Sequence, residues 1–217
     1  MRQSRAEGDW AESRLCTLRL MVPPFICMAG HKKVKPTALS TWVNDVRTFR
    51  ATFNYGDSDW VGTVALKQKI KTHVGQPPSV GLSLALFNEI VTWKLAGQED
   101  RTRHHRAKLT DDLVRKITAC AFSLTHPDPD YLTRARLYVL QGIPGVSTGV
   151  ASAILALTFP DLYCVIDPRI WKAIYGLSQE QFGLSDYKHC LADVRSASVT
   201  LGWPPQEVDF FAWKMTP

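Results

Sequence analysis

The hydrophobic residues of this chain recur every three or four positions over most of its length, which is the spacing of amphipathic helices. In residues 38–53, for example, apolar side chains stand at positions 39, 42, 43, 46, 49 and 53. The same spacing predicts further helices over 60–74, 82–95, 109–124, 131–140, 149–157, 169–175, 185–201 and 205–213. Residues 82–95 are apolar on most sides, so we expect this helix to be central and buried. No segment alternates convincingly between apolar and polar residues, and the pattern therefore predicts an all-α fold.

Several of these helices carry start signals. Asp59 is expected to cap the helix over 60–74. In the helix over 109–124, Thr110 precedes two acidic residues, which suit the first turn of a helix. Pro127 and Pro129 are expected to interrupt the chain before a helix that begins near Tyr131. These signals place polar and proline residues between the apolar segments, as expected for helices joined by short loops.

A turn rich in glycine and proline separates the helices predicted at 131–140 and 149–157. Gly142 and Gly145 can take positive φ and Pro144 fixes its own φ, so we expect a sharp turn with Thr148 as N-cap of the second helix. The first N–H groups of a helix lack intrahelical partners and lie at the positive end of its dipole, so this turn is suited to bind a phosphate. The alternative is an ordinary turn between two helices. The candidate phosphate-binding residues are Gly142, Ile143, Pro144, Gly145, Val146, Ser147, Thr148 and Gly149.

Asp167 follows the short apolar run 162–166 and stands directly before Pro168. Asp at the N-cap and Pro at the first helical position commonly open a helix, so capping alone would explain this pair. The same place also suits catalysis, because the helix dipole and neighbouring N–H groups favour the ionised carboxylate. A fixed anion about 4 Å from a developing positive charge is worth roughly 4 kcal/mol at an effective dielectric near 20, or on the order of a thousandfold in rate.

Together, the turn and the aspartate resemble the helix-hairpin-helix superfamily of base-excision DNA glycosylases, whose members carry a Gly-Pro-rich loop followed by an aspartate. The resemblance covers residues 80–176 and is sharpest over 140–171. Residues 143–146 match the loop of the family, whereas Ser147 stands where a second glycine is usual, and Ser accepts a positive φ less readily. The resemblance implies that Asp167 is the catalytic aspartate and that double-stranded DNA is the partner.

The resemblance also implies a domain organisation of two helical lobes around a cleft. Residues 36–78 would pack with 177–217 in the first lobe, and 79–176 would form the lobe that carries the hairpin and the aspartate. The target base would leave the duplex to reach the cleft. The base to be excised is not indicated. A role in defence against hypermodified viral DNA is compatible with the sequence but is not required by it.

Three charged residues near these motifs are candidate contacts. Arg169, in the helix after the aspartate, is expected to contact DNA, and Glu89 and Lys94, on the otherwise apolar helix 82–95, are candidates for the base pocket. The alternative for Glu89 and Lys94 is an ion pair within the protein. The run 101–108 carries four formal positive charges; we expect a solvated loop, with phosphate contact as the alternative.

The absence of a lysine on the second hairpin helix bears on the reaction. Lyase members of the family place a Schiff-base lysine about eighteen residues before the aspartate, and that position here is Gly149. The resemblance therefore implies a monofunctional enzyme that uses water and leaves an abasic site. Two alternatives stay open: a bifunctional glycosylase and lyase with a displaced amine at Lys94 or Lys172, and a non-catalytic DNA-binding protein in which Asp167 only caps its helix.

Composition agrees with this interpretation. The formal net charge of +6 and the pI of about 9.1 suit a polyanionic partner. The five cysteines are odd in number and widely spaced, which indicates reduced thiols in a cytoplasmic protein, associated with the nucleoid when bound to DNA. Only Cys190 lies near the C-terminus, where some members of the superfamily hold an iron–sulfur cluster with four cysteines. We expect no cofactor, no metal ion and a monomer.

The N-terminal 30 residues differ in make-up from the rest of the chain. Arginines precede an apolar stretch over 15–29, which is too short and too interrupted to span a membrane. We expect residues 1–35 to be a flexible or annotation-extended terminus, with initiation at Met21 or Met28 as an alternative start. No association with a membrane is expected.

Overall fold

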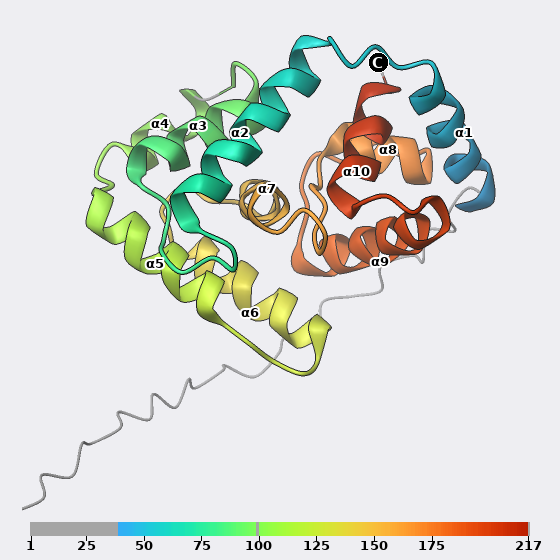
Figure 1. Cartoon of the computed structure of the whole chain (residues 1–217). Coiled ribbons are helices and arrows are strands. Elements are labelled where there is room, and N and C mark those ends of the chain that lie inside the picture. The colour runs from blue at the N-terminus through green and yellow to red at the C-terminus, as the bar shows by residue number, and fades with distance from the viewer. Residues whose placement is uncertain (1–38, 99, 217) are drawn as a thin grey trace, which may run out of the picture. The chain divides into compact units, whose positions relative to one another are not determined.

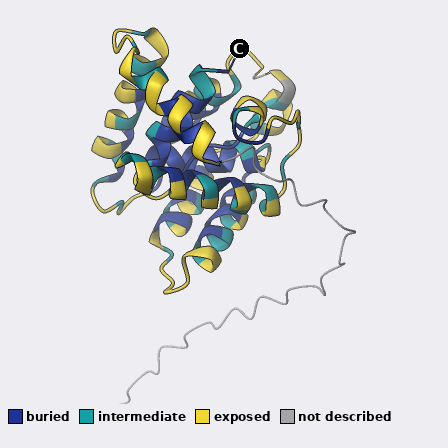
Figure 2. Ribbon diagram, turned by 90° about the vertical axis from the view of Figure 1, so that its right-hand side faces the viewer, coloured by how far each residue is buried: buried dark blue, intermediate teal, exposed yellow. Residues whose placement is uncertain are grey.

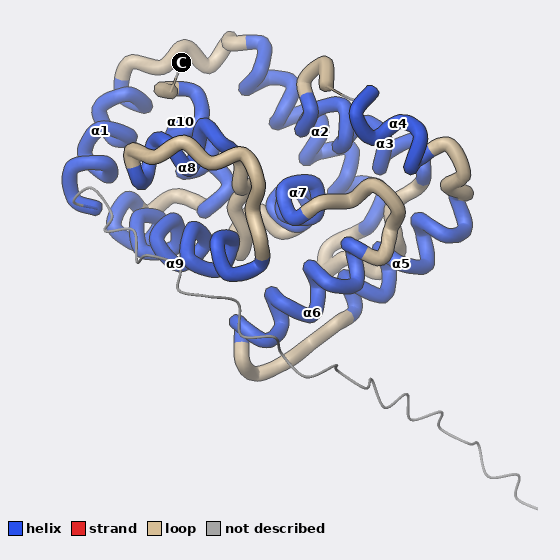
Figure 3. The backbone as a smooth tube through the Cα atoms, turned by 180° about the vertical axis from the view of Figure 1, so that it is seen from behind, coloured by secondary structure: helices blue, strands red, loops and turns tan. Residues whose placement is uncertain are grey.

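The computed structural model describes residues 39–98 and 100–216, and this part of the chain contains ten helices and no strand (Figure 1) (Figure 3). The helices are α1 Leu39–Ala51, α2 Ser58–Val74, α3 Leu84–Leu95, α4 Asp100–Arg106, α5 Asp111–Ser123, α6 Pro129–Gln141, α7 Thr148–Thr158, α8 Pro168–Tyr175, α9 Leu184–Leu201 and α10 Pro205–Lys214. The expected all-α class is confirmed for these residues. The expectations for residues 1–35 lie outside the described part.

Helix α7 forms the centre of the fold, and Figure 1 shows it end-on among its neighbours. Its residues from Val150 to Thr158 are all buried, and it packs against α2, α3, α6, α9 and α10. Buried positions gather in this interior and exposed ones on the outer faces of the surrounding helices (Figure 2). The sequence of α7 mixes Ala, Ser and Val with larger aliphatic residues, so helices can approach it from every side.

Helix α3, which we expected to be the central one, is buried on one side only. Ala85, Glu89 and Thr92 are exposed and recur along one face at helical spacing. Leu86, Phe87, Ile90 and Val91 fill the opposite face. The many apolar residues of this segment therefore identified a helix with a large apolar face, but a few polar positions were enough to direct the other face outward.

The N-terminal ends of α2, α5 and α6 are set by side chains that accept backbone N–H groups of the first turn. Asp57, not Asp59, caps α2, because its carboxylate accepts the backbone N–H groups of Asp59 and Trp60. Asp128 caps α6 in the same way, so that Pro129 begins this helix instead of interrupting the chain. Proline tolerates the first helical position because the N–H it lacks has no partner there. Helix α5 has the predicted acidic first turn at Asp111 and Asp112, and Thr110 is its N-cap.

The run 101–108, expected as a solvated loop, forms most of the short helix α4, Asp100–Arg106. Its only acidic residue lies in the first turn and most of its basic residues lie in the last, an order that suits the helix dipole. Propensity alone would not hold a helix of seven residues in water. Helix α4 packs against the α6–α7 turn at Gly145, and this packing stabilises it from outside.

The first helix lies against the last ones. Helix α1 packs on α8, α9 and α10, whereas α2 packs on α3 and α7 (Figure 1). The division into two lobes, at residues 36–78 with 177–217 and at 79–176, stays a prediction. Among the described helices, none has both the length and the apolar character that a membrane crossing needs.

Candidate active site

Asp167 lies between a buried segment and helix α8. Residues 163–166 are buried, and Asp167 follows them in an extended conformation, with φ −157°. Its Oδ1 accepts the backbone N–H of Ile170 at 2.9 Å, so Asp167 caps α8 as predicted, with Pro168 in the first turn. The cap occupies one carboxylate oxygen and leaves the other for a different partner.

That partner is Lys94, which reaches Asp167 from α3. The Lys94 Nζ donates to Asp167 Oδ2 at 3.0 Å, and the side chains of Lys94 and Asp167 are only 9% and 16% exposed. An ion pair so poorly solvated holds both groups in place more firmly than a surface pair does. The two residues are 73 positions apart in the sequence, and only the packing of α3 on α7 brings them together.

Both side chains line a cavity of about 220 Å³. Helices α2, α3, α8 and α10 contribute to its wall, as does the segment that leads to Asp167. Its lining includes four ionisable groups and three aromatic rings: Asp59, Lys94, Asp167, Asp209, Trp93, Phe210 and Trp213. A concave wall that combines aromatic rings with a few converging polar groups is typical of binding sites for small organic rings.

Asp209 is the residue of this cavity that sequence reasoning missed. It lies on α10, is 2% exposed, and its Oδ2 accepts the backbone N–H of Val165 at 2.6 Å. Burial raises the pKa of the Asp209 carboxyl well above its ordinary value, although the hydrogen bond from Val165 opposes the shift. The negative charge of Asp167 raises this pKa further. The available signal was a single acid inside an apolar helical stretch, Val-Asp-Phe-Phe.

The α6–α7 turn is tight, as expected, but its conformation differs in two details. Gly145 has a positive φ of 84°, whereas Gly142 is right-handed with φ −66°. The N-cap of α7 is Ser147, not Thr148, since the Ser147 hydroxyl accepts the N–H of Val150 at 3.4 Å. Ser147 has φ −83° and needs no left-handed backbone, so a serine serves here where the family usually has glycine.

Two apolar side chains anchor this turn. Ile143 and Val146 are buried, and the N–H of Val146 donates to the carbonyl of Ile143 at 3.0 Å. Gly142, Pro144 and Ser147 remain exposed. The turn therefore presents backbone and small side chains to solvent beside the N-terminus of α7, which is the arrangement that a phosphate-binding loop needs.

Gly149 lies beside the lysine of the cavity. A Cβ added to Gly149 would stand 3.7 Å from Lys94 Cε and 3.4 Å from the carbonyl oxygen of Ile166. The lysine side chain from α3 thus runs next to Gly149, the position that the resemblance predicts to correspond to the lysine of lyase members. Glycine leaves space there for the longer side chain.

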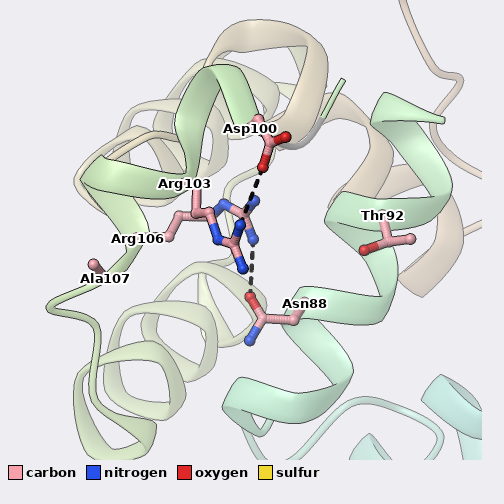
Figure 4. A pocket seen from close by; sticks show the side chains of 6 residues that line it. All are labelled: Asn88, Thr92, Asp100, Arg103, Arg106 and Ala107. Carbon is pink, nitrogen blue, oxygen red and sulfur yellow. Dashed lines mark hydrogen bonds and ion pairs between the residues drawn. The ribbon is translucent and has the colours of Figure 1, made fainter. Parts of the chain in front are cut away.

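Helix α4 packs directly on the turn. A Cβ at Gly145 would lie 3.1 Å from His105 Cβ and 3.4 Å from Arg106 Cγ. Figure 4 shows the adjacent hollow between α3 and α4, of about 440 Å³, in which Arg106 donates to Asn88 and Arg103 pairs with Asp100. Neither Asp167 nor Lys94 lines this hollow. Its place beside the turn adds basic side chains to the candidate phosphate-binding surface.

The remaining predicted site residues fall in different places. Arg169 is exposed, and its guanidinium carbon lies 4.7 Å from the ring centroid of Trp213, which lines the cavity. Glu89 is exposed and pairs with Lys69 at 2.7 Å, away from the cavity lining. The structure therefore brings Lys94 but not Glu89 to Asp167.

Within residues 39–98 and 100–216, no group of three or more His, Cys, Asp or Glu side chains is arranged to hold a metal ion. Comparisons of the chain with models of protein families, with curated proteins and with solved structures find no match.

Proposed function

We propose that this protein is a DNA glycosylase that hydrolyses the bond between sugar and base of a nucleotide turned out of duplex DNA. The observation that carries the proposal is the opening of Asp167 and Lys94 into a cavity of about 220 Å³ whose wall includes three aromatic rings. Pockets for drug-sized ligands usually measure roughly 300–1,000 Å³, so this smaller one suits a single flat ring system. Aromatic walls favour a nucleobase, which can stack on them.

In the proposed reaction, Asp167 faces the sugar of the everted nucleotide. As the bond between C1′ and the base nitrogen breaks, its electron pair leaves with the base and positive charge builds on the sugar ring. The carboxylate of Asp167 stabilises this charge and accepts a proton from the water that attacks C1′. Lys94 positions the carboxylate, because its ammonium binds the oxygen that the helix cap leaves free.

DNA binding is proposed for the surface that surrounds the α6–α7 turn. The first N–H groups of α7 and the exposed backbone at Gly142 and Pro144 would hold one phosphate. The basic side chains of α4 would contact the neighbouring phosphates, and Arg169 would contact the strand near the cavity. The sharp turn and the short helix thus form one continuous interaction surface.

Asp167→Asn tests the reaction. Asparagine also caps helices well, so the fold should be kept while single-turnover base release falls on the order of a thousandfold or more. The substrates are duplexes with one modified base each, including 8-oxoguanine, uracil, hypoxanthine and 5-hydroxymethylcytosine. Asp128→Asn is the matched control, because Asp128 and Pro129 open α6 as Asp167 and Pro168 open α8.

The control should release base at the wild-type rate. Equal rates for wild type and Asp167→Asn would contradict the proposed role of Asp167. Tight duplex binding without any abasic product would instead support the non-catalytic DNA-binding alternative.

A second candidate, a glycosylase that also cleaves the strand, is favoured by the amine of Lys94 at 3.0 Å from Asp167. After passing a proton to Asp167, this amine could condense with the C1′ aldehyde of an abasic site, releasing water and forming an imine. Loss of a C2′ proton would then break the C3′–O bond. Borohydride reduces such an imine and so traps the complex of protein and DNA. A trapped complex that Lys94→Met abolishes and Lys172→Met preserves would establish the lyase reaction. If no complex is trapped, the monofunctional reaction is the one supported.

A further inference from the structure

We propose that Asp209 is the acid of this site: a neutral carboxyl group that gives its proton to the departing base, which restricts the substrates to uncharged bases. The inference rests on the proposed glycosylase function and adds a second catalytic residue and a substrate class to it. Three features carry it, namely the position of Asp209 in the cavity, its unused hydrogen-bonding capacity and the charge balance around it.

Asp209 is buried and yet lines the cavity. Its Oδ2 is occupied by the N–H of Val165, two residues before Asp167, which ties α10 to the segment that carries the catalytic candidate. Within the described residues, this is the one hydrogen bond that the Asp209 side chain makes. Its second oxygen is therefore available to a ligand, and buried polar groups normally have a partner for each such oxygen.

The charges around Asp209 favour its neutral form. Lys94 and Asp167 already balance one another at 3.0 Å, so an ionised Asp209 in the same cavity would add an unpaired negative charge. The other cation that faces it, Lys67 of α2, donates to Gln206 Oε1 at 2.6 Å. Burial and the charge of Asp167 both raise the pKa of Asp209, while Lys94 and Lys67 only partly oppose them.

Three carboxyl groups line the cavity; Asp59 pairs with Lys214 at 2.6 Å, whereas Asp167 and Asp209 have opposite surroundings. Asp167 is partly exposed, pairs with an ammonium and caps a helix, all of which stabilise an anion. Asp209 is almost fully buried with a single backbone partner. Two acids in such different environments can divide the roles of anion and proton donor between them.

The proton of Asp209 completes the reaction. The base leaves C1′ with the electron pair of the broken bond, and a neutral base would depart as an anion. Transfer of the Asp209 proton to a ring nitrogen or carbonyl oxygen of the base neutralises it, and Asp167 takes up the proton lost by the attacking water. Asp209 ends as a carboxylate and Asp167 as an acid, so one proton passing back between them restores the site.

A proton on Asp209 makes the charge of the base decide which substrates react. A base alkylated on a ring nitrogen, such as 7-methylguanine, is already cationic and leaves as a neutral molecule without any acid. It also presents no free acceptor at the alkylated atom and would place a positive charge beside Lys94. The site therefore suits oxidised, deaminated or hypermodified bases that are uncharged.

The test compares wild type, Asp209→Asn and the control Glu207→Gln, which removes a carboxylate of the same helix that pairs with Arg50 outside the cavity. Asparagine keeps an acceptor for the N–H of Val165. We expect Asp209→Asn to slow release of neutral bases about 10²–10⁴-fold and to remove the decline in rate at alkaline pH. Glu207→Gln should match wild type, and wild type should release little 7-methylguanine.

A second measurement does not depend on activity. The difference infrared spectrum between wild type and Asp209→Asn at neutral pH should contain the carbonyl band of a protonated carboxylic acid. Absence of this band, preferential release of 7-methylguanine by wild type, or an unchanged rate and pH profile in Asp209→Asn would each overturn the acid role alone. A wild-type protein that releases no base from any duplex would overturn the proposed function, and the acid role with it.

Discussion

The ion pair between Lys94 and Asp167 makes a prediction at the scale of single residues. Lys94→Met removes the counter-ion of a carboxylate that is only 16% exposed. Breaking a fully buried pair typically destabilises a protein by about 3–5 kcal/mol, and partial exposure reduces this to about 1–3 kcal/mol. Urea denaturation of Lys94→Met, Asp167→Asn and the double variant should show coupling of at least about 0.5 kcal/mol. Additive effects would mean that the two groups do not interact in solution.

Asp209 makes a separate prediction for the pH dependence of stability. The unfolded chain loses this proton near its ordinary pKa of 3.8, whereas the native state retains it to higher pH. The stabilisation that the bound proton provides is complete below that value and is lost as pH rises towards the raised native pKa. The free energy of unfolding of wild type, relative to Asp209→Asn, should therefore fall as the pH rises above about 4, until the raised native pKa is passed. If the denaturation midpoints of wild type and Asp209→Asn change with pH in the same way, the predicted contribution of Asp209 is refuted.

At the scale of elements, the α6–α7 turn depends on Gly145. Its φ of 84° disfavours any side chain, and a Cβ there would stand 3.1 Å from His105 on α4. Gly145→Ala should lower the free energy of unfolding by about 1–2 kcal/mol and weaken duplex binding, because turn and α4 shift together. Gly142→Ala has a right-handed φ of −66° and no left-handed strain, but its Cβ would stand 3.0 Å from the carbonyl oxygen of Val139, so any loss there comes from that contact. Thermal unfolding and duplex titration measure the effect of Gly145→Ala, and unchanged stability and binding would argue against the special conformation of Gly145.

At the scale of the whole molecule, the turn and α4 form a single basic surface. Arg103 and Lys108 are exposed there, and each phosphate contact should contribute about one unit to the slope of log affinity against log salt. Arg103→Ala and Lys108→Ala should each reduce the slope by about this amount in duplex titrations. Lys116→Ala, which disrupts an exposed pair with Asp112 on α5, should leave it unchanged. If none of the three substitutions changes the slope, the DNA binds to a different surface of the protein.

Periodicity and capping residues predicted the helical class and most helix bounds, because helices form from contacts three or four residues apart. The same local rules identified Asp167 as the cap of α8 and the turn before α7. They failed for α4, a seven-residue helix stabilised by the turn it packs against. They also chose the wrong central helix, because a run of apolar residues shows that a helix has a large apolar face but not how many neighbours surround it.

The sequence by itself therefore determined the helices, the turn and the carboxylate that opens α8. Only the tertiary structure decided that Lys94 meets this carboxylate from 73 residues away and that Glu89 faces solvent. It also placed Asp209, 44 residues from its partner Val165, in the same cavity. The physical reason is that a side chain's role depends on the face its helix turns to its neighbours, and packing between distant segments sets that face.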